Sequence, residues 1–184
     1  MQNNLFIISG PSGAGKDFLI EALQKKLDIE RVKTSTTRAM RPGESNGNPY
    51  YFLTIAQFEQ KIKDNQFFEW AEEYNNFYGV TLAEIERFKN CGKICIWKIA
   101  YKGVIAAKKL MPEIKAILIN APLNQIEARL RNRDKQLSEE YIQERLEYNQ
   151  ELLDHKDLYD YEIMNGNGQA EKALNDLLEI INTQ

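Results

Sequence analysis

A glycine-rich segment near the amino terminus limits what this chain can fold into more than any other feature. Residues 10–16 read GPSGAGK and follow the apolar run Leu5–Ser9, and apolar side chains then recur at helical spacing from Phe18 to Leu27. This order predicts a buried strand, a tight loop and a helix. Backbone N–H groups of such a loop, together with the helix start, bind phosphate oxygens. The segment therefore predicts a phosphate-binding loop in an α/β domain.

Position 17 of this loop departs from the usual pattern, because Asp17 replaces the Ser or Thr whose hydroxyl normally binds Mg²⁺. A carboxylate is also a hard oxygen ligand for Mg²⁺, so Asp17 is the candidate metal ligand and Mg²⁺ the expected cofactor. The extra negative charge beside a polyphosphate requires a metal or another cation to offset it. Lys16 is expected to reach the β- and γ-phosphates. The residues expected to contact the phosphates of this polyphosphate, the phosphate donor, are Ser12, Gly13, Ala14, Gly15, Lys16 and Asp17.

Further apolar runs alternate with helical patterns along the rest of the chain. Strands are expected at 94–97, 116–119 and 161–164, and helices at 83–89, 103–110, 122–131 and 170–181. Continuous apolar strands of this kind favour a parallel sheet that is covered by helices on both faces. The fold class is therefore α/β.

Two stretches interrupt this alternation. Residues 34–81 are rich in Thr, Arg, Asn, Tyr and Gly, with short aromatic strands at 50–52 and 67–70 around a helix at 56–63. Residues 125–157 are almost entirely polar and helical, with Ser138 as the expected N-cap. Both are predicted to be lobes inserted into one core, which comprises about residues 1–33, 82–124 and 158–184.

Composition excludes several classes of protein. The 184 residues carry a net charge of −3, which argues against a nucleic-acid partner. No apolar run approaches the roughly 18–20 residues of a membrane span, and no secretion signal is visible, so a cytoplasmic location is expected. Cys91 and Cys95 are expected to be reduced structural thiols, and the single histidine, His155, a solvated residue at a helix end.

The segment 34–47, TSTTRAMRPGESNG, indicates a second phosphate site. It contains Arg38 and Arg41 and is followed by Tyr50 and later Tyr78, and two arginines with two tyrosines would bind a phosphate through charge-assisted and neutral hydrogen bonds. Glu69 would accept hydrogen bonds from the N1–H and N2 groups of guanine. The alternative, a solvated basic loop beside an aromatic cluster, explains only part of this ordered set.

With these motifs the chain resembles the guanylate kinase family over nearly its full length. The resemblance implies a P-loop NTPase-type parallel sheet core flanked by helices, with an inserted acceptor-binding lobe and a helical lid, that transfers the γ-phosphoryl group of ATP to GMP or dGMP. It implies ATP and GMP as substrates and a monomer or homodimer, without membrane or nucleic-acid partners. The implied catalytic residues are Lys16, Arg133 and Arg145, and Asn165 corresponds to a late asparagine of the family. The implied acceptor contacts are Thr34, Arg38, Arg41, Tyr50, Glu69, Tyr78 and Thr81.

The chain also departs from its family in ways that affect both substrates. Family members carry two acids, D-x-D, where this chain has Lys98 and Ala100, and a small hydroxyl residue where it has Val80. The end of a core strand and the start of the P-loop helix lie close together in this type of sheet. We therefore expect Asp17 and Lys98 to form an ion pair, in which Asp17 partly replaces the lost acid and Lys98 limits the added negative charge.

Two other functions remain open at the level of sequence. A glycine-rich loop that ends in Lys-Asp also resembles the ribose 1,5-bisphosphate phosphokinases, whose acceptor is not a nucleotide, although Glu69 and the intact acceptor segment favour GMP. The third possible function is that of a catalytically silent guanylate-kinase-like domain that binds phosphorylated peptides. Such domains typically lose the P-loop lysine, which this chain retains as Lys16.

Overall fold

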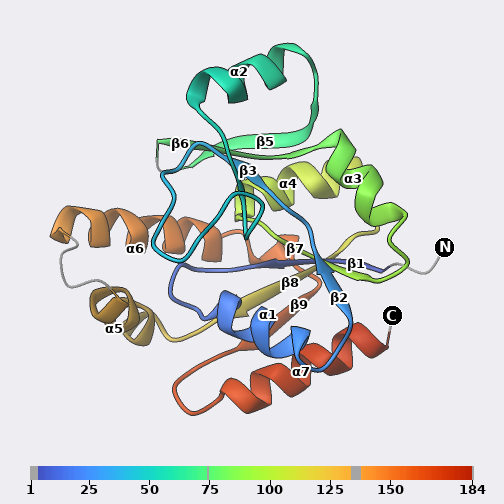
Figure 1. Cartoon of the computed structure of the whole chain (residues 1–184). Helices are drawn as coiled ribbons and strands as arrows, with labels where there is room; N and C mark the ends of the chain where they lie inside the picture. The colour runs from blue at the N-terminus through green and yellow to red at the C-terminus, as the bar shows by residue number, and fades with distance from the viewer. Residues whose placement is uncertain (1–3, 74, 134–137, 184) are drawn as a thin grey trace.

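The core of the molecule is a five-stranded parallel sheet (Figure 1). The structure, a computed structural model, describes residues 4–73, 75–133 and 138–183. The strand order is β2 (Ile29–Arg31), β7 (Ile94–Lys98), β1 (Leu5–Ser9), β8 (Lys115–Asn120) and β9 (Tyr161–Met164). Among the described residues, no helix combines the length and the apolar character that a membrane crossing requires.

Helices cover both faces of this sheet because its strands are apolar on both sides. In β1, Phe6 and Ile8 pack with α1 (Lys16–Gln24) and α7 (Ala170–Asn182). The alternate residues Leu5 and Ile7 face α3 (Leu82–Lys89) and α4 (Tyr101–Leu110). Side chains of a strand alternate between its two faces, so one continuous apolar run contributes to two hydrophobic clusters.

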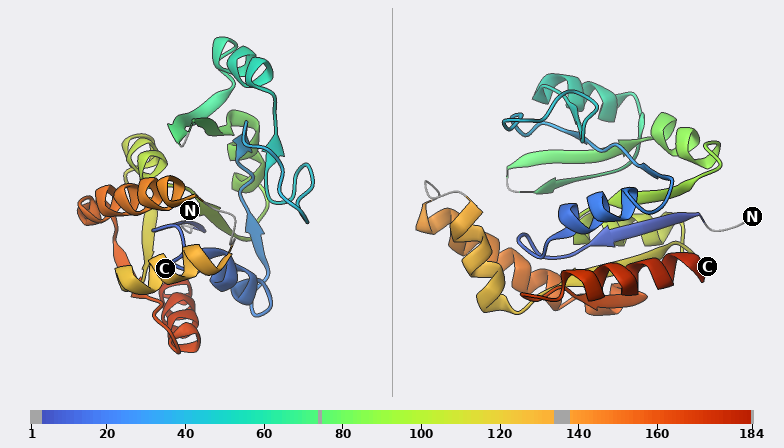
Figure 2. Two further views of the ribbon diagram at one scale, coloured as in Figure 1. Left: turned by 90° about the vertical axis from the view of Figure 1, so that its left-hand side faces the viewer. Right: turned by 60° about the horizontal axis from the view of Figure 1, so that its bottom comes forward.

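A second sheet lies above the core and carries its own helix (Figure 2). Its strand order is β4 (Tyr51–Phe52), β3 (Ser35–Thr36), β6 (Asn76–Thr81) and β5 (Phe67–Glu73). The helix α2 (Ile55–Lys63) starts at a capping box between Thr54 and Gln57. Phe58 anchors it, with ring centroids 4.3 Å from Phe67 and 5.3 Å from Phe77.

Two polar helices project at one end of the core, on the left of Figure 1. They are α5 (Leu123–Arg133) and α6 (Glu139–Leu153), and a short 3-10 helix, η1 (Lys156–Leu158), follows. Ser138 caps α6 by accepting a hydrogen bond from the Tyr141 N–H, as the sequence predicts. Ile126 and Leu130 of α5 pack against Leu146 of α6, so the two helices share a small apolar seam.

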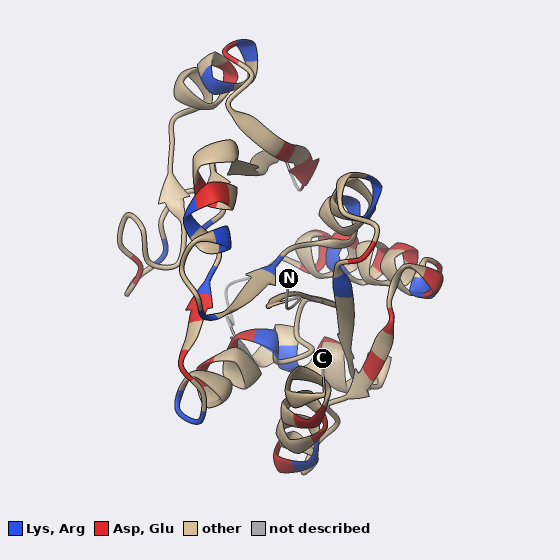
Figure 3. Ribbon diagram, turned by 90° about the vertical axis from the view of Figure 1, so that its right-hand side faces the viewer, with Lys and Arg blue, Asp and Glu red and all other residues tan. Residues whose placement is uncertain are grey.

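The predicted fold class is confirmed, and the four apolar core strands lie within a residue or two of their predicted positions. The strands β2, β3 and β6 were not predicted. β2 has three residues, two of which are charged, and β3 has only two residues, so neither shows an apolar pattern. Cys91 and Cys95 are both free, as expected, with their Sγ atoms 3.1 Å apart. Residues of both charges occur on the helices around the core, consistent with the nearly balanced net charge (Figure 3).

Candidate functional site

A cavity of about 530 Å³ lies between the core and the second sheet. It is lined by the P-loop, by the ends of β1 and β7, by the lobe of residues 34–81 and by α6. Ligands of open α/β sheets bind outside the carboxyl ends of the strands, which is where this cavity lies. Residues that contact the phosphate donor or the acceptor are therefore expected to line this cavity.

Glycines permit the backbone of the P-loop. Gly10 has a φ of +144°, and a Cβ there would lie 2.0 Å from the carbonyl oxygen of Ile119. Gly15 has a φ of +88°, and a Cβ there would lie 2.5 Å from Nδ2 of Asn165. Positive φ and such close approach exclude a side chain at both positions. The Lys16 ammonium donates to the carbonyl oxygens of Gly10 and Pro11 at 2.6 and 2.8 Å, which fixes it over the loop.

Three side chains from distant parts of the sequence clamp the loop. Asn165 donates to the Ala14 carbonyl at 2.8 Å, and Arg129 of α5 donates to the Gly13 carbonyl at 3.3 Å. Asn149 of α6 is fully buried and accepts the N–H of Ser12 at 2.9 Å. Sequence reasoning identified Asn165 but missed Arg129 and Asn149, because nothing in the pattern of a polar helix shows which amide is buried.

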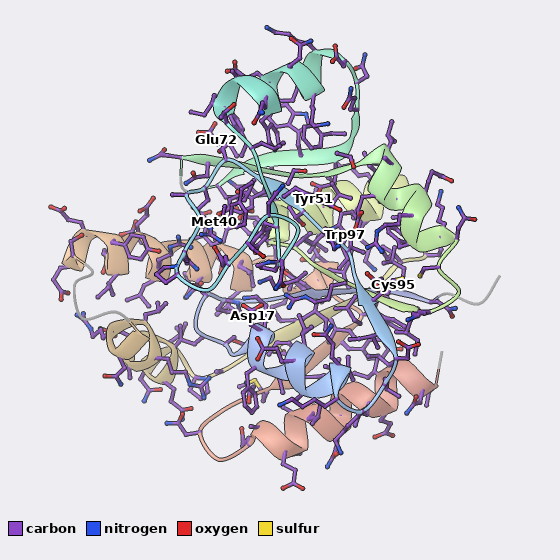
Figure 4. The ribbon with its side chains drawn as sticks, viewed as in Figure 1. Asp17, Met40, Tyr51, Glu72, Cys95 and Trp97 are labelled. Carbon is purple, nitrogen blue, oxygen red and sulfur yellow. The ribbon has the colours of Figure 1, made fainter. Side chains whose placement is uncertain are left out.

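The expected ion pair between Asp17 and Lys98 is present. The Lys98 Nζ lies 2.7 Å from Oδ1 of Asp17, and the Arg31 guanidinium, which sequence reasoning missed, lies 3.2 Å from the same oxygen. Asp17 lies at the start of α1, where Figure 4 labels it. Desolvation acts to raise the pKa of Asp17, but Lys98, with Lys16 and Arg31, more than offsets it and lowers this pKa to about 2.

The arginines and tyrosines of the acceptor segment come together. The Arg38 guanidinium donates to both carboxylate oxygens of Glu44, at 2.8 and 3.0 Å, and lies 5.5 Å from the centroid of the Tyr50 ring. The rings of Tyr50 and Tyr78 meet edge to face, with centroids 6.3 Å apart. The lining residues of this part of the cavity are Arg38, Arg41, Glu44, Tyr50 and Tyr78.

Thr34 and Glu69 form a buried polar pair of lining residues in the lobe. Thr34 is 4% exposed, and its hydroxyl has no hydrogen-bond partner among the described residues. Glu69 is 7% exposed, and its burial, with the nearby charge of Glu73, raises its pKa to about 8. A backbone hydrogen bond from Val80 acts to lower this pKa but does not offset the burial, and both Thr34 and Glu69 line the cavity.

Comparison with known proteins assigns the family. The family described as guanylate kinase matches residues 2–184. A guanylate kinase of Pseudoalteromonas translucida is 39% identical over 100% of this chain and 88% of its own length, and one of Fusobacterium nucleatum is 36% identical over 96% and 95%. This chain belongs to the guanylate kinase family. The crystal structure of guanylate kinase from Anaplasma phagocytophilum superimposes with a TM-score of 0.76, at 26% identity over 97% of this chain and 84% of that one.

Not every residue expected from the guanylate kinase resemblance lies at the cavity. Thr81 does not line it, because its hydroxyl caps α3 by accepting the Glu84 N–H at 3.2 Å. Arg145 lines it and lies 4.9 Å from the Tyr141 ring centroid. Arg133 is the last residue of α5, and its side chain lies outside the described part of the structure. Gly13, Ala14 and Gly15, which were expected to contact the donor phosphates, belong to the loop but are not among the residues that line the cavity.

Most of the departures from the guanylate kinase pattern lie at the cavity, including Asp17 of the P-loop. Lys98, the last residue of β7, and Ala100, two residues further on, both line it. Val80 is fully buried in the core-facing apolar cluster and does not contact the cavity. Of the substituted positions, Asp17, Lys98 and Ala100 therefore change the groups that line the cavity, whereas Val80 does not.

Proposed function

We propose that this protein transfers the γ-phosphoryl group of ATP to GMP or dGMP, giving ADP and GDP or dGDP. The observation that carries the proposal is that the P-loop lysine, Lys16, lines the same cavity as the buried pair Thr34 and Glu69. One end of this cavity suits phosphates, and the other offers a hydroxyl and a carboxyl group to a base.

The donor half binds the phosphates of ATP through the backbone of the P-loop. Its N–H groups and the amino-terminal end of α1 provide partial positive charge, and the Lys16 ammonium provides a full one. Phosphoryl transfer requires little covalent help from the protein, so positioning and charge neutralisation account for most of the catalysis. Arg145 of α6, which lines the cavity, adds a cation close to the reacting phosphates.

The acceptor half binds GMP through two sets of residues. Arg38, Arg41, Tyr50 and Tyr78 bind its phosphate, and Thr34 and Glu69 recognise guanine. The ionised Glu69 carboxylate accepts two hydrogen bonds from the N1–H and N2 groups of the base. Because the raised pKa keeps Glu69 protonated in the absence of a ligand, GMP binding requires this side chain to lose its proton. Adenine lacks this pair of donors, so AMP leaves the buried carboxylate without these two hydrogen bonds.

The residues of the site fit Mg²⁺ only in combination with ATP. No group of three or more metal-binding side chains exists in the described part of the chain, and Asp17 supplies a single carboxylate at the P-loop. Mg²⁺ is commonly bound by one or two carboxylates together with substrate phosphates, so Asp17 would bind it beside the β- and γ-phosphates. There the ion would neutralise negative charge on the transferred group. Because Oδ1 of Asp17 already accepts from Lys98 and Arg31, these cations weaken Asp17 as a metal ligand.

We further propose that residues 34–81 act as an acceptor-binding lobe and residues 125–157 as a lid on one core. The separate sheet of the first segment and the small apolar seam between α5 and α6 support this division. Approach of the two segments would exclude water from the cavity and so suppress hydrolysis of ATP.

A coupled assay that measures ADP formation tests the function. ATP with Mg²⁺ is offered with GMP, dGMP, AMP or ribose 1,5-bisphosphate in turn, and the phosphorylated product is identified by chromatography. We expect turnover of GMP and dGMP, slow turnover of AMP and loss of activity when Mg²⁺ is chelated. Turnover of ribose 1,5-bisphosphate alone would instead assign a sugar-phosphate kinase, and phosphopeptide binding without any turnover would assign a silent binding domain.

A further inference from the structure

Lys98 has a position that the guanylate kinase reaction as described above does not use. It is the last residue of β7, paired in register with Ile8 of β1, so it lies at the carboxyl edge of the sheet beside the P-loop. Its side chain is only 16% exposed and lines the cavity. A lysine that is largely buried against a substrate cavity requires anionic partners there, because burial of an unpaired ammonium is costly.

The contacts of Lys98 join the donor half of the cavity to the acceptor half. Its Nζ donates to Oδ1 of Asp17 at 2.7 Å, next to the P-loop lysine. On its other side the Nζ lies 5.4 Å from the centroid of the Tyr50 ring, within the range of a cation–π contact. Tyr50 belongs to the set that we assign to the acceptor phosphate. The ammonium therefore lies between the proposed positions of the two substrates.

Lys98 also retains hydrogen-bonding capacity for a ligand. An ammonium has three N–H donors, and Asp17 is the one hydrogen-bond acceptor of Nζ seen among the described residues. By contrast, the Arg38 guanidinium is already bound by both oxygens of Glu44. Asp17 is shared with Arg31, so two cations face one carboxylate and a net positive charge remains.

The ammonium stays charged in this environment. Burial acts to lower the pKa of Lys98, but Tyr50 and Asp17 more than offset it, and the pKa is raised. Two phosphate groups that must approach each other carry like charges and repel. A fixed cation between them would reduce this repulsion.

We propose that Lys98 binds the phosphate of the GMP acceptor on the side that faces the transferred phosphoryl group, and that Asp17 positions its ammonium. The proposal rests on the function proposed above. It gives the substitution of an acid by Lys98 a direct role in substrate binding. In this role Asp17 is a positioning residue, and Lys98 is a catalytic residue because it contacts the reacting group.

The affinity that the phosphate adds to the nucleoside tests the proposal. Dissociation constants of guanosine and GMP are measured by calorimetry for the wild-type protein and for Lys98→Met, Lys98→Arg and Lys93→Met. Lys93 forms an exposed ion pair with Asp28 away from the cavity, so Lys93→Met is a matched control for loss of one lysine. The dissociation constant of guanosine divided by that of GMP gives the affinity that the phosphate adds. We expect Lys98→Met to reduce this ratio by about tenfold to a hundredfold, which is the contribution of a charge-assisted hydrogen bond. Guanosine binding should be unchanged.

In the other two variants, the ratio should depend on whether a positive charge remains at position 98. Lys98→Arg keeps the charge and should retain the ratio to within about threefold, the difference reflecting the shape of the guanidinium. Lys93→Met should match the wild type. An equal loss in Lys98→Arg and Lys98→Met, or an unchanged ratio in Lys98→Met, would contradict the proposal.

A double variant separates direct contact from simple neutralisation of Asp17. If Lys98 acts only by offsetting the Asp17 charge, then Asp17→Asn/Lys98→Met should restore the ratio, which would overturn the proposal. If Lys98 contacts the phosphate, the ratio should stay low. The proposed function fails separately, because in that case the wild-type protein itself neither binds GMP more tightly than guanosine nor phosphorylates it.

Discussion

Two carboxylates in one cavity, Asp17 and Glu69, are held in opposite states. Lys98 and Arg31 contact Asp17 and lower its pKa to about 2, whereas burial near Glu73 raises the pKa of Glu69 to about 8. The first carboxylate is therefore fully ionised at neutral pH, and the second is mostly protonated. Side-chain type alone does not decide the role of an acid, because its neighbours and its exposure to water decide its charge.

The donor half of the site, which contains Asp17, and the acceptor half, which contains Glu69, differ in how closely they follow the family pattern. The acceptor half follows the guanylate kinase pattern closely, and its residues meet at the cavity with the exception of Thr81. The donor half keeps its lysine but rearranges the charges around it. The acceptor segment thus keeps the residues of the family pattern, and the charged residues around the P-loop are what differ from it.

The largest expected effect separates the two halves. Lys16→Ala removes the cation at the transferred phosphate, so the transfer rate should fall by about a hundredfold to a thousandfold. GMP binding should remain, since the acceptor contacts lie on the lobe. The coupled assay measures the first quantity and calorimetry with GMP the second. Lys172→Ala, on the exposed surface of α7, is the control. Unchanged transfer in Lys16→Ala would refute the role of the loop.

A smaller effect is expected from the titration of Glu69. Because its carboxylate must be ionised to accept from guanine, GMP affinity should rise with pH from 7 toward about 8, by up to about tenfold per pH unit, and level off above the pKa. The Glu69→Gln variant should bind GMP weakly and without this pH dependence. Glu59→Gln, on the exposed side of α2, should behave as the wild type. Parallel pH profiles for Glu69→Gln and the wild type would show that another group titrates.

The same carboxylate should reduce stability in the absence of GMP. Its folded-state pKa lies above the ordinary value of 4.5, so the unfolded chain loses its proton first and Glu69 lowers the unfolding free energy as pH rises from 4.5 to about 8. Glu69→Gln should therefore stabilise the protein at pH 7, by about 1–3 kcal/mol. Urea unfolding at several pH values measures this gain, which should vanish near pH 4. A lower unfolding free energy of Glu69→Gln than of the wild type at pH 7 would show that burial of the Glu69 carboxyl group does not destabilise the protein.

The smallest effect is expected at Asp17, for which the sign is reversed. Its lowered pKa means that its stabilising contribution is present above the ordinary value of 3.8 and is lost as pH falls toward about 2. The side chain is 59% exposed, so the contribution should stay below about 1 kcal/mol. Asp17→Asn should unfold less steeply with acid than the wild type, and Asp28→Asn, an exposed partner of Lys93, is the control. Identical acid profiles for Asp17→Asn and the wild type would remove the ion pair as a source of stability.

Most of the core was predictable because its signals are local. Leu5–Ser9 shows a buried strand by its continuous apolar residues, and the glycines that follow show where the backbone must turn tightly. The phosphate contacts of the acceptor lobe could be proposed for a similar reason, because Arg38, Arg41, Tyr50 and Tyr78 follow one another in the order of the family pattern. Thr81 was placed at the acceptor because it lies next to Val80 in the sequence, but in the fold it is the N-cap of α3.

The sequence by itself predicted the α/β class, the glycine-rich loop after β1, most of the acceptor-lobe residues that line the cavity and the pairing of Asp17 with Lys98. Only the tertiary structure showed that Arg31 joins that pair, that Asn149 and Arg129 clamp the loop and that Glu69 and Glu73 lie close enough to interact. The physical reason is that these interactions join residues far apart in the chain or depend on exclusion from water. Neither the distance between two side chains nor the water around them is encoded in a local pattern.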